Sequence, residues 1–148
     1  MKSITSIKQS AIQEKWFLVD AKGQRIGIIA SKVAELLMGK NNPLTKAYHK
    51  PSSHVIVLNA GKIDFTTKRG ITKFYKSYSG YPDGLTQINL ENTYALHPER
   101  PIENAVKGML PRTKRGDMMI ANLKIYVDDQ HIHQAQQPEV INLKNFKV

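Results

Sequence analysis

The sequence contains no cysteine, which excludes a disulfide framework, a thiol nucleophile and any metal site built on thiolates. It also lacks long hydrophobic runs, since no apolar stretch approaches the roughly 18 residues that a membrane-spanning helix requires. Residues 1–8 include lysines but no continuous apolar segment, so we expect no secretory signal. We therefore expect a soluble cytoplasmic protein with no membrane partner, while a location inside an organelle stays open.

Acidic residues are scarce compared with basic ones. There are 12 Asp and Glu against 22 Lys and Arg, which gives a formal net charge of +10 at pH 7. A length of 148 residues with 41% hydrophobic residues is typical of one globular domain that buries its own core. We expect a single domain over 1–148, with an N-terminal extension at 1–14 and a C-terminal tail at 142–148. The surplus of cations favours a polyanionic partner such as nucleic acid.

Hydrophobic periodicity alternates along the chain between strand-like and helix-like segments. The predicted strands are 16–20, 54–58, 73–78 and 123–127. The predicted helices are 25–38, a segment that starts near Pro98 and ends before Pro111, and 114–121. Gly39 is placed to end the first helix, and 128–148 is predicted as a polar tail with no strong period. The order of elements predicts an α/β fold, a three-layer α/β/α sandwich around a small, mostly parallel sheet of about four strands.

Gly23 and Gly27 stand before and inside the start of the first predicted helix, where backbone N–H groups can bind phosphate. The spacing differs from that of a dinucleotide fingerprint, and no acidic residue lies at 40–50 to hold a ribose. We favour a turn and close helix–strand packing at the two glycines. A nucleotide-binding regulator is the weaker alternative.

Two carboxylates and two imidazoles occur within six residues, at Asp128, Asp129, His131 and His133. Such a cluster could bind a divalent ion, so the alternative function is a metal-dependent RNA-processing enzyme. We favour instead hydrogen bonds to phosphate, to a 2′-OH or to a neighbouring loop. In that role we predict His131, His133, Gln136 and Gln137 as polar RNA contacts.

Cations and aromatic residues alternate between residues 62 and 81. Ammonium and guanidinium groups pair with phosphates, and flat side chains stack on unpaired bases. In the competing interpretation Phe74 and Tyr78 pack inward and the lysines are merely solvated. We predict Phe74 as core and leave the burial of Tyr75 and Tyr81 open. The candidate RNA ligands of this segment are Lys68, Arg69, Lys73, Tyr75 and Lys76.

A second basic cluster surrounds the predicted helix end at Pro111. A favourable position near a helix C-terminus would explain Lys107 but not the whole group. Four cations within nine residues suit the binding of phosphate, which arginine can contact through two hydrogen bonds at once. The candidate ligands are Lys107, Arg112, Lys114 and Arg115, with Gly108 beside them and Pro111 shaping the turn.

Three segments of the chain resemble the bacterial-type thirteenth protein family of the large ribosomal subunit. In order, they are Ala105-Val-Lys-Gly-Met-Leu-Pro111, Leu123-Lys-Ile-Tyr126 and His131-x-His133-x-Ala-Gln-Gln-Pro138. Weaker agreement in the same order is found at 16–20, Gly27-x-x-Ala30, Gly39-Lys40, 57–60, 79–82 and Arg100. The resemblance covers roughly residues 15–143. The chain departs from the family pattern at Ile28, Ser53, His54, Arg115 and Asp117.

This resemblance implies a three-layer α/β/α fold, binding to large-subunit ribosomal RNA, contacts with neighbouring large-subunit proteins and a role early in subunit assembly. We therefore predict a structural constituent of the ribosome and not an enzyme. We expect no cofactor, no metal ion and no small-molecule substrate.

Overall fold

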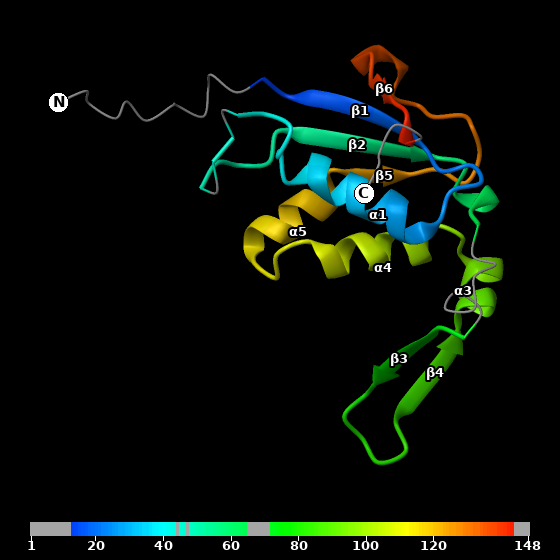
Figure 1. Ribbon diagram of the computed structural model, residues 1–148. Helices are drawn as coiled ribbons and strands as arrows, with labels where there is room; N and C mark the ends of the chain where they lie inside the picture. Colours follow the sequence, from blue (N-terminus) through cyan, green and yellow to red (C-terminus); the bar gives the residue numbers. More distant parts are fainter. Residues whose placement is uncertain (1–12, 44, 47, 65–71, 144–148) are drawn as a thin grey trace.

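The computed structural model describes residues 13–43, 45–46, 48–64 and 72–143. Within these residues the strands form a four-stranded parallel sheet of order β5-β2-β1-β6 and a separate antiparallel pair, β3-β4. The strands are β1 (Lys15–Asp20), β2 (Ser53–Leu58), β3 (Phe74–Tyr78), β4 (Leu85–Asn89), β5 (Leu123–Ile125) and β6 (Glu139–Ile141). Figure 1 shows the β3–β4 hairpin projecting away from the body that contains the larger sheet.

Helices cover one face of the parallel sheet, as Figure 1 shows for α1, α4 and α5. The helical elements are α1 (Ile26–Leu37), α3 (Leu90–Leu96), α4 (Arg100–Met109) and α5 (Lys114–Ala121), with short 3-10 turns η2 (Ala60–Lys62) and η3 (Gln134–Gln136). Gly39 follows α1 with a positive φ of 73°, which confirms its predicted place at the end of that helix. No helix in the described part of the chain is both long and apolar enough to cross a membrane.

The core lies between this sheet face and the helices. Strands β1 and β2 pair in parallel, with Phe17 opposite Val55 and Val19 opposite Val57. Alternation along a strand points these four side chains to the same face, and all four are buried in one cluster. The helices supply the facing side chains, among them Ile29, Val33, Ile102, Val106 and Met119. Each fully buried side chain of this kind stabilises the fold by about 1.5–3 kcal/mol.

The opposite sheet face is covered by the segment after β5. Trp16 and His54 are paired on this face, and their rings stack with centroids 4.3 Å apart. The His133 ring lies 5.1 Å from that of Trp16 and 6.1 Å from that of Tyr126. Within the described residues this third layer is an irregular segment with the η3 turn instead of an α-helix. The predicted α/β class and small parallel sheet are confirmed. Opposite the helices, the described residues form an irregular layer without an α-helix.

The membership of the sheet differs from the prediction. The strand predicted at 73–78 forms, but it pairs with β4 in the hairpin. The fourth strand of the parallel sheet is β6, which lies in the stretch predicted to be a tail and pairs with the central strand β1. Leu143, just after β6, is buried in the core cluster. Most of the predicted N-terminal extension, residues 1–12, and residues 144–148 of the predicted tail lie outside the described residues.

The structure confirms the predicted turn at Gly23 but not the predicted close packing at Gly27. Gly23 has a positive φ of 65°, so the turn between β1 and α1 uses the conformational freedom of glycine. Within the part of the chain that the structure describes, a Cβ at Gly27 would meet no atom within 4 Å. The prediction of close packing at Gly27 is therefore wrong, because that position of α1 is exposed.

Candidate nucleic-acid interface

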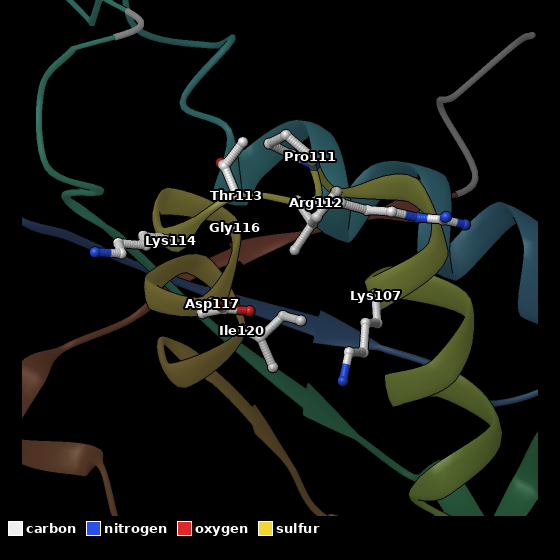
Figure 2. A pocket seen from close by; sticks show the side chains of 9 residues that line it. Lys107, Pro111, Arg112, Thr113, Lys114, Gly116, Asp117 and Ile120 are labelled. Carbon is white, nitrogen blue, oxygen red and sulfur yellow. The ribbon is translucent and has the colours of Figure 1, made fainter. Parts of the chain in front are cut away.

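A pocket of about 320 Å³ opens where α4 ends and α5 begins. Its lining includes three basic residues, Lys107, Arg112 and Lys114, and the apolar residues Leu110 and Ile120. Figure 2 shows Lys107 on α4 across from Asp117 and Ile120 on α5, while the Lys114 side chain extends away from the pocket. We call these lining residues the α4–α5 pocket.

The tight connection between the two helices builds this pocket. Pro111 follows α4 and cannot continue the helix, and the Thr113 N–H donates to the Pro111 carbonyl at 2.9 Å. Gly116 is buried in the first turn of α5. A Cβ at Gly116 would collide with the Pro111 carbonyl oxygen, so only glycine lets α5 begin this close to the end of α4. We did not predict this role, because the sequence does not show which backbone atom lies above Gly116.

The pocket combines several groups that interact with anions. Lys107, Arg112 and Lys114 are all exposed. Thr113 precedes α5 without a side-chain hydrogen bond to the helix, so the N–H groups of the first turn have no side-chain cap. Asp117 places one carboxylate among these groups. A free anion would be repelled by that carboxylate, whereas RNA offers a 2′-OH that can donate to it beside phosphates that need cations.

Arg115 differs from its three basic neighbours because it is half-buried. Its Nε donates to the His49 carbonyl at 3.0 Å, and its Nη2 lies 3.5 Å from the Lys46 carbonyl. These contacts tie the start of α5 to the loop that precedes β2. The side chain thereby positions α5, and its donors point toward the protein's own backbone.

The second predicted cluster lies on the β3–β4 hairpin. Lys76 is exposed, and the Lys73 Nζ lies 5.2 Å from the centroid of the Tyr75 ring. Tyr75 is half-buried, its hydroxyl has no hydrogen-bond partner among the described residues, and burial raises the pKa of this phenol. Lys68 and Arg69 lie outside the described residues. The prediction that Phe74 is core is wrong, because this side chain is 53% exposed on a strand pair that is separate from the main sheet.

The third predicted group lies on the sheet face opposite the helices. The His133 N–H donates to the Nδ1 atom of His131 at 3.2 Å, and both imidazoles are half-buried. Gln136 and Gln137 are exposed at and just after η3. Among the described residues, no group of three or more His, Cys, Asp or Glu side chains is placed to hold a metal ion. This arrangement lends no support to catalysis by Asp128 and Asp129 with these histidines.

The structure does not bring the three predicted groups into one site. In Figure 1 the α4–α5 connection, the hairpin and the segment around η3 lie on different parts of the molecule. A large ligand that reaches several surfaces fits this distribution better than a small one does.

The family model described as "Ribosomal protein L13" matches residues 14–132. The chain belongs to the ribosomal protein L13 family. Similar relatives named large ribosomal subunit protein uL13 occur in Petrotoga mobilis, with 43% identity over 93% of this chain and 91% of the relative, and in Natranaerobius thermophilus, with 43% identity over 94% and 97%. The relative of the same name in Caldanaerobacter subterraneus subsp. tengcongensis is 42% identical over 93% and 96%.

Membership in the L13 family confirms the resemblance based on the Gly-Met-Leu-Pro and Ala-Gln-Gln-Pro segments. The L13 family is structural and not enzymatic, so this chain is a structural protein of the ribosome and not an enzyme. The α4–α5 pocket lies within the matched residues 14–132, as do the hairpin and His131.

Proposed function

We propose that this protein binds and stabilises large-subunit ribosomal RNA in the cytoplasmic ribosome, next to other proteins of the large subunit. The observation that carries this proposal is the α4–α5 pocket, whose lining residues include three exposed cations next to a helix start that has no side-chain cap. Lys107, Arg112 and Lys114 pair with phosphates, and Asp117 accepts a hydrogen bond from a ribose. Arg115 holds α5 in place for these contacts.

The hairpin cations and the segment around η3 extend the proposed interface. Lys73 and Lys76, with Lys68 and Arg69 nearby in the sequence, form a second line of phosphate contacts. His131, His133, Gln136 and Gln137 are the shorter polar contacts. A net charge of +10 favours association with a polyanion before any specific contact forms.

We also propose that the protein acts early in assembly of the large subunit. Its buried core is built from its own sheet and helices, so folding of this domain does not depend on RNA. A preformed domain can bind newly made RNA as a rigid body and hold two of its segments together.

The test is a salt titration of binding to large-subunit ribosomal RNA transcribed in vitro. The triple variant Lys107→Ala, Arg112→Ala, Lys114→Ala should bind more weakly. Because each lost phosphate contact lowers the slope of log K against log salt by about 1, this variant should lose about 3 from the slope. In cells, it should also accumulate incomplete large-subunit particles.

A matched control removes three other exposed cations, in the variant Lys15→Ala, Lys22→Ala, Lys40→Ala. Both triple variants lower the net charge equally, so a difference in slope reports local contacts. Equal slopes for the two variants would mean that the pocket is not a specific phosphate site. A wild-type protein that shows no salt dependence would overturn the whole proposal.

A further inference from the structure

The β3–β4 hairpin has two chemically different faces. In its register Phe74 pairs with Asn89, Lys76 with Gln87 and Tyr78 with Leu85. Because alternate residues share a face and directly paired residues do too, one face consists of these six side chains. We call it the aromatic face: Phe74, Lys76, Tyr78, Leu85, Gln87 and Asn89. The other face carries Tyr75, Ser77, Thr86 and Ile88.

The aromatic face is unusually exposed for its composition. Phe74 is 53% exposed, Tyr78 is 65% exposed and Leu85 is 53% exposed. Figure 1 shows the hairpin as an arm whose faces are not covered by any labelled helix or strand. A two-stranded hairpin is marginally stable alone, and exposed apolar side chains grouped on one face mark an interaction surface.

The chemistry of this face favours nucleic acid over protein as the occupant. Neither strand contains an acidic residue, and Lys76 lies between Phe74 and Tyr78. Lysine is depleted in the buried centres of protein–protein interfaces, because its ammonium group would lose water without gaining a partner. Phosphate provides that partner. The Gln87 amide adds a donor and an acceptor that can meet a base edge.

The spacing of the two rings also fits a nucleic-acid chain. Phe74 and Tyr78 are four residues apart on one strand, which separates them by about 13 Å. Two rings at this separation cannot sandwich one base, but each can take a different unpaired base. Lys76 projects between them, where the connecting phosphates of such a segment would pass.

We propose that the aromatic face binds an unpaired segment of ribosomal RNA, with Phe74 and Tyr78 each stacking on a base and Lys76 pairing with an intervening phosphate. This inference rests on the proposed function, because it takes the same RNA as ligand. It assigns base contacts to Phe74 and Tyr78, which are not among the RNA ligands predicted from the sequence. In this proposal the hairpin binds unpaired bases, whereas the α4–α5 pocket contacts the RNA backbone.

The test uses the full chain and the same transcribed RNA. The double variant Phe74→Leu, Tyr78→Leu keeps apolar side chains but removes both rings. Each lost stacking contact should weaken binding about 5-fold or more, so we expect at least about 25-fold weaker binding for both, with an unchanged salt slope. Chemical probing of bases should show unpaired bases that the wild type protects and the variant does not.

Three further variants keep the test interpretable. Tyr78→Phe retains a ring, so it should bind like the wild type even if the double leucine variant folds poorly. Ser77→Ala, Thr86→Ala alters a directly paired couple on the opposite face and should also leave binding unchanged. Lys76→Ala should lower the salt slope by about 1.

The possible outcomes separate this inference from the proposed function. If the double leucine variant binds RNA as tightly as the wild type, and the wild type binds with a steep salt slope, stacking is wrong and the proposed function stands. If that variant binds RNA normally but fails to enter large-subunit particles, the aromatic face binds a protein, and the inference is overturned. If the wild type does not bind the RNA, the proposed function itself fails.

Discussion

Residues of the same type at the α4–α5 connection have different roles, as its two glycines show. Gly108 and Gly116 lie eight residues apart on consecutive helices. A Cβ at Gly108 would meet no atom of the described residues within 4 Å, whereas one at Gly116 would collide with a backbone carbonyl. Gly108 is therefore not required by the protein's own packing. The role of Gly108 as an RNA contact beside Lys107 stays a prediction.

The two glycines make a matched pair for stability measurements. Gly116→Ala should lower the free energy of unfolding by about 1–3 kcal/mol or more, because overpacking against backbone cannot be relieved by a rotamer change. Gly108→Ala should raise it by up to about 1 kcal/mol, since alanine favours an exposed helix position. Urea unfolding monitored by circular dichroism measures both values. Equal effects of the two substitutions would contradict the steric role of Gly116.

For the four cations at this turn, the sequence predicts the exposure of three but not the partial burial of Arg115. Lys107, Arg112 and Lys114 were predicted as exposed cations around a turn, and the structure places them so. Arg115 looked equivalent to Lys114 in the sequence. What separates them is a pair of carbonyls at Lys46 and His49, more than sixty residues earlier in the chain, and no local pattern encodes that contact.

At the scale of elements, segments with strong local signals were predictable and segments stabilised by distant partners were not. The α1 helix and strands β1 and β2 have apolar patterns that identify them, and α5 was predicted with its observed bounds. Strand β6 has three residues, and it exists because its backbone pairs with the central strand β1. The prediction of β3 as a strand was right, but its assignment to the parallel sheet was wrong, because composition does not say whether a strand joins the main sheet.

The layer formed by β1, β2 and the segment after β5 should make stability depend on pH. Burial lowers the pKa of His54; the carboxylate of Glu14, 3.8 Å away, raises it, and the charges of Lys124 and His133 lower it. The net direction is below the ordinary value of 6.5. In the range just below 6.5 the unfolded chain then binds more protons at this residue than the folded chain does. The free energy of unfolding should therefore rise with pH through that range.

Urea unfolding between pH 5 and pH 8 checks this expectation. In His54→Asn the rise of unfolding free energy with pH should be smaller than in the wild type, whatever the absolute stability of the variant. A rise of the same size in both proteins would show that other groups cause it. Glu14→Gln is the informative comparison, because loss of the carboxylate should lower the pKa of His54 further and make the rise larger.

At the scale of the whole molecule, the basic surfaces lie on different parts of a single folded body (Figure 1). Exposed charges separated by more than about 10 Å are largely screened from one another at 0.1 M salt. The α4–α5 pocket and the hairpin should therefore bind phosphates independently unless the RNA connects them. A protein that contacts one folded RNA through both surfaces restricts that RNA to conformations in which both contacts form.

Simultaneous binding can be tested by adding the charge removals together. The pocket variant Lys107→Ala, Arg112→Ala, Lys114→Ala should lower the salt slope by about 3, and the hairpin variant Lys73→Ala, Lys76→Ala should lower it by about 2. If both surfaces bind the same RNA at once, the combined variant should lose about 5, because distant substitutions act additively. If the RNA occupies only one surface at a time, a variant that lacks one surface still binds RNA through the other. Its salt slope is then the slope of the surface that remains. The combined loss will then exceed the sum of the separate losses.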